Sequence, residues 1–222
     1  MDAEDRHSEA LEAEIISDPA LKAHQEARNG LRQFDAAIEL IETWLQPERP
    51  FRLRASAISS LNRTALEGLS HYAGIYRPAR IEIKGSKHKP PEAHLVAELV
   101  ENLCDYVNGN WNLSAIHLAS YVMWRLNWIH PFVDGNGRTT RAISFVVLCV
   151  RLGYRVPGSN TIPEQIANNK TPYYEALEAA DASLHGEQFD VTSVETLLGA
   201  LLANQLASVI HEARANRPPA DV

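Results

Sequence analysis

Apolar residues recur at helical spacing along most of the chain, and this periodicity constrains the fold more than any other feature. Near the N-terminus, Ile38, Ile41 and Leu45 stand three or four positions apart, as on one face of a helix. Prolines and glycines separate successive runs of this kind. The expected helices span residues 1–46, 56–72, 93–106, 113–129, 138–152, 171–184 and 191–213. The pattern therefore predicts an all-α protein.

One segment, 76–91, departs from the helical pattern and alternates apolar with charged residues. The alternating run consists of Ile81, Glu82, Ile83 and Lys84, and Gly85-Ser86 follows it. Alternation followed by a turn pair is typical of a short β-hairpin. Two uses of such a hairpin remain open. It forms a plain two-stranded element, or its exposed edge takes up an extended segment of another protein as an added strand.

The composition indicates an ordinary globular chain. It has 222 residues, 45% of them hydrophobic, which suits one domain or one domain with a helical extension. The 28 acidic residues outnumber the 21 basic ones and give a formal net charge of -7. This balance argues against a protein that binds nucleic acid by neutralising phosphates. Net charge discriminates weakly, however, because a local basic pocket can lie within an acidic surface.

The two cysteines and the apolar runs bear on the compartment. Cys104 and Cys149 are too few for a disulfide framework, and apolar residues flank both, so we expect reduced thiols in the core. Residues 1–14 are acidic and lack the apolar stretch of a secretory signal. The longest apolar stretch, 142–150, is far shorter than the roughly 20 residues that span a membrane. We expect a cytoplasmic protein without a membrane segment.

The segment His130–Arg141, with the sequence HPFVDGNGRTTR, combines features of an anion-binding site. Gly135 and Gly137 let a backbone turn present several N–H groups to an oxyanion, and the following helix N-terminus adds partial positive charge. Arg138 and Arg141 stand three residues apart on that helix, so both side chains project from one face. Guanidinium groups bind phosphate oxygens through paired, charge-assisted hydrogen bonds.

Two further residues of this segment suggest chemistry. Asp134 would repel a phosphate unless a cation lay between them, so it is a candidate Mg²⁺ ligand. His130 has the only nearby side chain whose ordinary pKa lies near neutrality, so it is the candidate general base. Taken singly, the histidine is typical of a helix cap, the glycines of a turn and the arginines of a solvated face. Their combination within residues 130–141 favours a functional site.

The segment 130–141 resembles the complete signature of the Fic family. That signature is His-Pro-Phe, any residue, Asp or Glu, Gly-Asn-Gly-Arg, two free positions and Arg, and every specified position is present. Two other stretches are similar to family elements: 76–91 to the flap that binds the target, and 166–181 to the helix that closes the nucleotide pocket. The resemblance divides the chain into an N-terminal helical extension (1–50), a Fic core (51–190) and a C-terminal helix with a tail (191–222).

The resemblance implies a helical bundle with a short hairpin flap, and transfer of AMP from ATP to a Tyr, Ser or Thr hydroxyl of a target protein. His130 would deprotonate the hydroxyl, and Asp134 would hold Mg²⁺ between the α- and β-phosphates. The phosphates would be bound by five residues: Gly135, Asn136 and Gly137 at the α-phosphate, Arg138 at the β-phosphate and Arg141 at the γ-phosphate. The protein itself is a possible target.

Glu67-Gly68 resembles the end of the inhibitory motif of self-restrained Fic proteins, whose glutamate pairs with the last signature arginine. The position that holds Ser or Thr in that motif is Arg63 here. A carboxylate at the place of the γ-phosphate would pair with Arg141 and repel ATP. We therefore expect Glu67, within the helix 56–72, to inhibit the enzyme. The alternative is an exposed glutamate on an amphipathic helix.

Other predictions concern the nucleotide base, rival functions and assembly. Asn168 and Tyr173 are candidates for an adenine pocket, or else serve as a cap and as packing. One rival function is removal of AMP from a modified protein, with Glu67 orienting a water molecule. Another is a regulatory module that binds ATP and transfers nothing. The apolar faces at 191–213 and in the N-terminal helices leave room for a homodimer.

Overall fold

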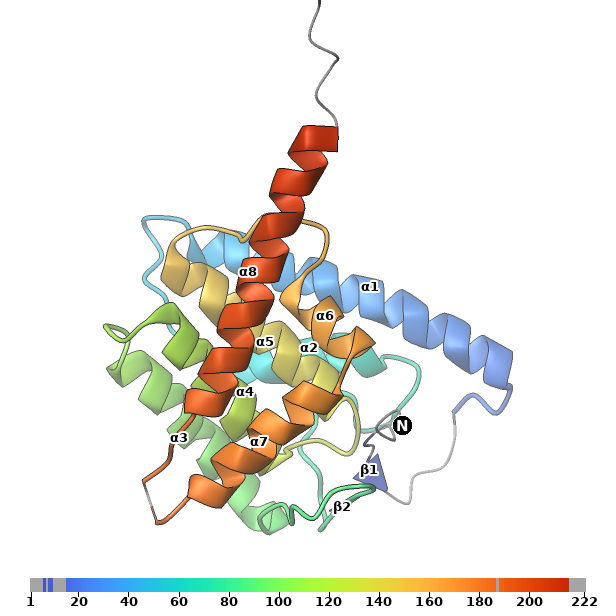
Figure 1. Ribbon diagram of the computed structural model, residues 1–222. Coiled ribbons are helices and arrows are strands. Elements are labelled where there is room, and N and C mark those ends of the chain that lie inside the picture. The colour runs from blue at the N-terminus through green and yellow to red at the C-terminus, as the bar shows by residue number, and fades with distance from the viewer. Residues whose placement is uncertain (1–5, 7, 10–14, 187, 216–222) are drawn as a thin grey trace, which may run out of the picture.

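The computed structural model describes residues 6, 8–9, 15–186 and 188–215, and these form a helical protein with one very small strand pair (Figure 1). The helices are α1 (Pro19–Trp44), α2 (Ala55–Leu66), α3 (Val96–Gly109), α4 (Ala115–Ile129), α5 (Asn136–Leu152), α6 (Ile162–Asn168), α7 (Thr171–Ser183) and α8 (Thr192–Ala215). A short 3₁₀ turn, η1 (Ala93–Leu95), precedes α3. The predicted all-α class is confirmed.

Helices α4 and α5 form the centre of the molecule and make its most extensive helix contact. Both are buried along most of their length by neighbouring helices: α1 and α2 cover α5, while α7 and α8 pack against α4 (Figure 1). Leu118 and Val122 of α4 and Val146 of α5 have no exposed surface. The loop that joins α4 to α5 is the Fic-like segment, so a well-packed core supports both of its ends.

Several helix boundaries follow from local signals. Asp18 begins α1 because its carboxylate accepts hydrogen bonds from the N–H groups of Ala20 (2.8 Å) and Leu21 (2.9 Å), and Pro19 suits the first turn. Ser114 caps α4 in the same way, with 3.0 Å between its Oγ and the nitrogen of His117. The predicted helix 1–46 is too long, since Ser8–Glu9 form a strand and the helix begins only at Pro19; residues 1–5, 7 and 10–14 lie outside the described residues. The short helix α6 was not predicted from the sequence.

Helix α2 is shorter than the predicted 56–72, since it ends at Leu66. Buried amide side chains of α1 take up the carbonyl groups at this end. The Nδ2 group of Asn29 donates to the carbonyls of Ala65 (3.3 Å) and Glu67 (2.8 Å). Gly68 then turns the chain with a φ of 73°, a left-handed conformation that suits glycine. The spacing of apolar residues cannot predict a helix end that depends on side chains distant in the sequence.

The predicted β-hairpin over 76–91 is wrong. Strand β2 (Glu82–Ile83) pairs antiparallel with β1 (Ser8–Glu9), so its partner comes from the N-terminal segment (Figure 1). After β2 the chain turns at Gly85 and runs toward α4, where His88 Nε2 donates to the carbonyl of Trp128 at 2.8 Å. Pro90 and Pro91 have no N–H group for a returning strand. Alternation in the sequence predicts an extended segment, but it does not predict which strand pairs with that segment.

The structure also bears on the cysteines and on membrane-spanning helices. Cys104 and Cys149 are buried and free, as expected of core thiols. None of the helices in the described part of the chain combines the length and the hydrophobicity that crossing a bilayer requires.

Candidate active site

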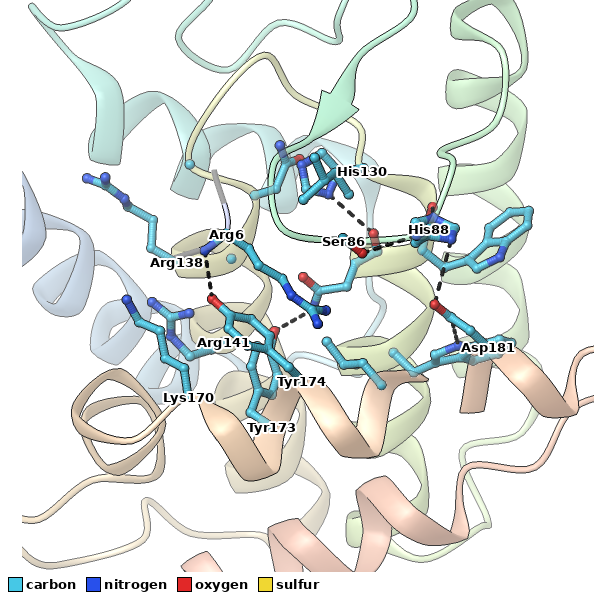
Figure 2. A pocket seen from close by; sticks show the side chains of 18 of the residues that line it. Arg6, Ser86, His88, His130, Arg138, Arg141, Lys170, Tyr173, Tyr174 and Asp181 are labelled. Atoms are coloured by element: carbon cyan, nitrogen blue, oxygen red, sulfur yellow. Dashed lines mark hydrogen bonds and ion pairs between the residues drawn. The ribbon is translucent and has the colours of Figure 1, made fainter. Parts of the chain in front are cut away.

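The loop between α4 and α5 lines a cavity of about 250 Å³. All seven residues predicted to act from this loop line the same cavity: His130, Asp134, Gly135, Asn136, Gly137, Arg138 and Arg141. Tyr173 and Lys170 border it from the start of α7 (Figure 2). A contiguous stretch of sequence and the beginning of a distant helix therefore enclose one polar pocket.

His130 is held in an uncommon backbone conformation. It follows α4 as its C-terminal cap with φ 51° and ψ 60°, and it is the one described residue other than glycine with positive φ. The residue is 8% exposed, and burial lowers the pKa of the imidazole from its ordinary value of 6.5 to about 3. The Nδ1 atom lies 3.4 Å from the carbonyl oxygen of Asn127, which can only accept. The ring is therefore neutral, with its proton on Nδ1 and its basic nitrogen at Nε2.

Arg77 fixes the start of the loop. It is 3% exposed, and its Nε donates to the carbonyl of His130 at 2.8 Å. The remaining guanidinium nitrogens donate to carbonyls at both ends of the flap segment, those of Ala79 (3.0 Å) and Pro91. The guanidinium also lies at the C-terminal end of α4, where helix carbonyls concentrate negative charge. One buried side chain thus joins α4, the signature loop and the flap.

Asn136 fixes the middle of the loop. Its Oδ1 accepts from the N–H of Phe132 at 2.9 Å, and its Nδ2 donates to the carbonyl of the same residue at 2.8 Å. Phe132 is fully buried and anchors the loop in the core. The side-chain oxygen of Asn136 is therefore committed to the loop, and this contact gives the residue a holding role beside the predicted phosphate contact.

Asn62 of α2 fixes the far side of the loop. It is fully buried, and its Nδ2 lies 3.0 Å from the carbonyl of Asp134 and 3.2 Å from Oγ1 of Thr139. Its Oδ1 accepts from the N–H of Gly74 at 2.9 Å. A Cβ on Gly135 would stand 3.0 Å from the Asn62 amide, and the φ of 72° there also favours glycine. The first glycine of Gly-Asn-Gly is thus matched to α2.

The start of α5 supplies the anion-binding features that the sequence suggested. The helix begins at Asn136, and the first N–H groups of a helix have no acceptor within it. Arg138 and Arg141 line the pocket beside this helix end, and Lys170 adds a third cation that was not predicted (Figure 2). Arg141 also hydrogen-bonds the hydroxyl of Tyr173. These groups together suit a ligand with several phosphates.

Asp134 has a carboxylate at the pocket, as a magnesium ligand requires, but the described residues supply no cluster of further ligands beside it. Its Oδ1 accepts from the N–H of Gly135 at 2.6 Å, and the side chain is exposed to the pocket. Among the described residues, no group of three or more His, Cys, Asp or Glu side chains is placed to hold a metal. One carboxylate beside a phosphate site suits Mg²⁺, which commonly keeps its waters and takes further oxygens from the substrate.

Comparison with known proteins bears on the same segment. The model of the Fic/DOC family matches residues 52–148, a range that includes the whole loop. Residues 52–148 therefore match a Fic domain. The "Protein adenylyltransferase Fic" of Drosophila willistoni is 32% identical over 110 residues, which are 49% of this chain and 20% of that protein. The counterpart in Drosophila grimshawi is 31% identical over 110 residues. The match thus spans about a fifth of these curated relatives.

Solved structures agree with the Fic fold. A Fic-domain signalling protein from Bacteroides thetaiotaomicron superposes with a TM-score of 0.70 at 21% identity, covering 93% of this chain and 78% of that one. Fic-1 from C. elegans superposes with a TM-score of 0.63 at 21% identity, covering 89% of this chain and 55% of that one. At these identities the likeness establishes the fold.

Some predicted residues lie away from the Fic pocket. The carboxylate of Glu67 pairs with Arg32 of α1 at 2.5 Å, so the ion pair with Arg141 is not formed in this structure. Asn168 is exposed at the end of α6 and is not among the residues that line the pocket. Of the four flap residues only Ile83 reaches the pocket, since Ile81 is buried and Glu82 and Lys84 are exposed.

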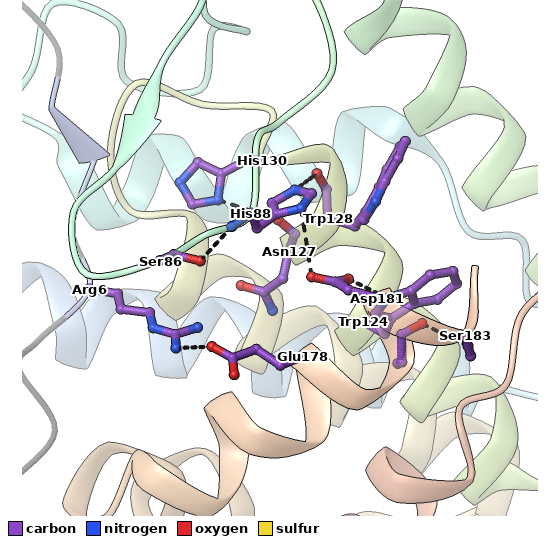
Figure 3. A network of polar contacts seen from close by, with 11 residues as sticks. Arg6, Ser86, His88, Trp124, Asn127, Trp128, His130, Glu178, Asp181 and Ser183 are labelled. Carbon is purple, nitrogen blue, oxygen red and sulfur yellow. Dashed lines mark hydrogen bonds and ion pairs between the residues drawn. The ribbon is translucent and has the colours of Figure 1, made fainter. Parts of the chain in front are cut away.

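The wall of the pocket opposite the signature cations was not predicted. Asp181 Oδ1 accepts from the indole N–H of Trp124 at 2.8 Å, and its Oδ2 lies 3.6 Å from Nδ1 of His88 (Figure 3). Burial raises the pKa of the Asp181 carboxyl. Asp181 falls within the stretch that resembles the pocket-closing helix, which was a usable signal. His88 carried no signal, because its role depends on where the flap folds.

Proposed function

We propose that this Fic domain transfers AMP from ATP to a hydroxyl side chain of a target protein. The observation that carries the proposal is the neutral His130 beside a helix N-terminus and the cations Arg138, Arg141 and Lys170 in one pocket. The names of the relatives support the same activity, since they are protein adenylyltransferases. One Fic-domain structure of this fold, with a TM-score of 0.53, is a complex with an adenylylated protein.

The proton transfer belongs to His130. Its Nε2 accepts the proton of the target hydroxyl while the hydroxyl oxygen forms a bond to the α-phosphorus. The bond from that phosphorus to the bridging oxygen of the β-phosphate breaks, and pyrophosphate leaves. The hydrogen bond from Nδ1 to the carbonyl of Asn127 keeps Nε2 unprotonated and orients the ring. His130 is the first residue after α4 and has a positive φ.

The nucleotide itself adjusts the strength of this base. In the empty pocket, burial disfavours the charged imidazolium and keeps the pKa low. Phosphate charges close to the ring favour the imidazolium, so nucleotide binding raises the pKa toward the working range of a general base. The base therefore becomes effective when the substrate that it serves is present.

The signature loop holds the triphosphate. Backbone N–H groups of Asn136 and Gly137 at the start of α5 bind the α-phosphate, while Arg138 and Arg141 bind the β- and γ-phosphates. The N–H of Gly135, also expected at the α-phosphate, donates to Asp134 in this structure and must leave that carboxylate to join them. Asp134 would hold Mg²⁺, which would offset the charge of the phosphates. Tyr173 borders the place of the nucleotide from α7, and its buried hydroxyl accepts from Asn127 Nδ2 at 2.5 Å.

Glu67 acts as an inhibitor, in this proposal, when its carboxylate turns from Arg32 toward Arg141. Two contacts support a position close to the loop. Leu66, the preceding residue, would lie 3.3 Å from a Cβ on Gly135, and the carbonyl of Glu67 is held by Asn29 at 2.8 Å. The ion pair with Arg32 is largely exposed, with 46% and 57% of the two side chains accessible, so exchanging partners costs little.

The proposal is tested by incubating the purified chain with α-phosphate-labelled ATP and Mg²⁺, alone and with a host lysate. His130→Asn is the matched variant, because asparagine tolerates positive φ better than other residues that retain a side chain. We expect transfer of label by the parent and a loss of about 10²–10⁴-fold in the variant. ATP binding by calorimetry without label transfer would instead identify a binding module. Equal labelling by parent and variant would rule out His130 as the base.

A further inference from the structure

The edge of β2 is already occupied by the chain's own N-terminal segment. Strand β1 (Ser8–Glu9) lies antiparallel to β2 (Glu82–Ile83), with Ser8 opposite Ile83 and Glu9 opposite Glu82 (Figure 1). Paired backbone groups of this kind bind an extended segment largely without regard to its sequence. The edge therefore accepts a strand, and this structure shows one in place.

Arg6, two positions before the strand, occupies a defined seat on α7. Its guanidinium pairs with Glu178, and its Cζ lies 4.2 Å above the centre of the Tyr174 ring. Its backbone N–H donates to the Tyr174 hydroxyl at 3.3 Å. The stem of its side chain lies over the turn after β2, where Arg6 Cγ would be 3.8 Å from a Cβ on Gly85. Tyr174, Glu178 and the Gly85 turn, which we call the cation seat, leave the side chain 19% exposed.

The cation seat opens into the pocket that contains the base. Arg6, Ile83 and His130 line one cavity, and Figure 3 shows Arg6 and Glu178 beneath the imidazole. A segment that lies on β2 with a cation in this seat is thus placed beside His130. An aromatic face and a carboxylate together select a cation over a neutral or acidic side chain.

Resting on the proposed function, we propose that the β2 edge and the cation seat dock an extended target segment that carries Arg or Lys two residues before the paired strand. Arg6 and the strand Ser8–Glu9 hold that site as an internal competitor. The occupant is a protein strand because the contacts combine backbone pairing with one side-chain seat. Docking by the chain's own segment excludes the target until the target displaces it.

The internal contact is suited to displacement. It pairs only two residues on each strand, and the Glu178 side chain is 56% exposed, so its ion pair is weak by itself. Its advantage is attachment, since a tethered segment acts at an effective concentration of about millimolar. A target that pairs over more residues and also fills the cation seat competes successfully against so short a strand.

A charge exchange tests the proposal without ATP. The probe is a fluorescent synthetic peptide of residues 1–14, measured by anisotropy against the full chain. Arg6→Glu in the protein places a carboxylate opposite Glu178 and releases the internal segment. We expect the peptide to bind this variant at least about tenfold more tightly than it binds the parent. Arg49→Glu makes the same charge change at an exposed site away from the pocket, and it should behave as the parent.

The reciprocal pair identifies the seat. A peptide carrying Arg6→Glu should fail on the Arg6→Glu protein and bind the Glu178→Arg protein, while the unchanged peptide should show the reverse preference. Faster hydrogen exchange within β2 in the Arg6→Glu protein should accompany release of the segment. Equal peptide binding by parent and variant, or no binding to any of these proteins, would overturn the proposal. Label transfer from ATP is measured separately, so the two proposals fail independently.

Discussion

The signature loop and the flap border the same pocket, yet they are held in opposite ways. Buried side chains fix the loop from three sides: Arg77 at His130, Asn136 at Phe132 and Asn62 at Asp134. The flap edge, by contrast, is covered by a two-residue strand pair and a partly exposed ion pair. The groups to which we assign chemistry are held rigidly, whereas the edge to which we assign the protein target is covered by a contact that can be replaced.

This difference matches what each region has to do in the proposed reaction. Stabilising phosphate charge depends on donors that are already in position, since rearranging them during the reaction raises the barrier. Accepting a protein strand requires an edge that can be vacated at little cost. The following predictions test this contrast, and those for the loop have the largest expected effects.

Replacing Arg77 should cause the largest loss of stability. Arg77→Ala leaves the carbonyls of His130, Ala79 and Pro91 without their donor in a buried site. We expect a loss of about 3 kcal/mol or more in the free energy of unfolding, measured in urea. Arg80→Ala is the matched control, because Arg80 is 71% exposed and pairs with Glu92 at the surface. A loss in the control comparable to that in Arg77→Ala would contradict this account.

Replacing Asn62 should cost somewhat less and should also disturb the pocket. Asn62→Ala removes hydrogen bonds to Asp134, Thr139 and Gly74. We expect about 2 kcal/mol of destabilisation and weaker ATP binding by calorimetry. Asn112→Ala, at an exposed position, should change neither quantity. Unchanged ATP affinity in Asn62→Ala would show that the loop does not depend on α2.

The low pKa of His130 predicts an acid-sensitive fold. The native imidazole titrates at about 3 and the unfolded one near 6.5, so the unfolded chain binds more protons between these values. Stability is therefore fully present above about pH 6.5 and declines as the pH falls toward 3. Between about pH 7 and pH 5 the parent should lose about 2 kcal/mol more than His130→Asn. If the melting temperatures of the parent and of His130→Asn fell equally with decreasing pH, this interpretation would be wrong.

Smaller effects are expected at the end of α2, where Glu67 pairs with Arg32. If Glu67 restrains the enzyme by turning toward Arg141, Glu67→Gly raises label transfer and Arg32→Ala lowers it severalfold by freeing the carboxylate. The two variants are compared in the same label-transfer assay, with Arg28→Ala on the same helix as the control. A rise in both variants would mean that the Glu67–Arg32 pair itself holds the inactive state.

The sequence predicted the residues of the loop well because they are contiguous. Glycines, a histidine and two arginines within one short stretch carry their chemistry with them, and folding needed only to place a helix on each side. Arg77 and Asn62 were missed since their roles depend on carbonyls that lie far away in the sequence. Nothing near either residue distinguishes it from an ordinary surface side chain.

The flap shows the reverse case. The extended conformation of Glu82 and Ile83 follows from local alternation, but the hairpin prediction supplied a neighbouring partner where the structure uses Ser8 and Glu9. The seat of Arg6 on α7 was equally hidden, because a cation near an acidic N-terminus carries no sequence signal for a distant tyrosine. Long-range pairing determines the replaceable region of this protein, and local patterns do not report it.

The central claim is that the loop between α4 and α5 transfers AMP, and the position of the label tests it directly. Parallel incubations use ATP labelled at the α-phosphate or at the γ-phosphate, with the parent chain, His130→Asn and Arg80→Ala. The account predicts protein labelling from α-labelled ATP alone, abolished in His130→Asn and retained in Arg80→Ala. Labelling from γ-labelled ATP, or α-labelling that survives in His130→Asn, would contradict it.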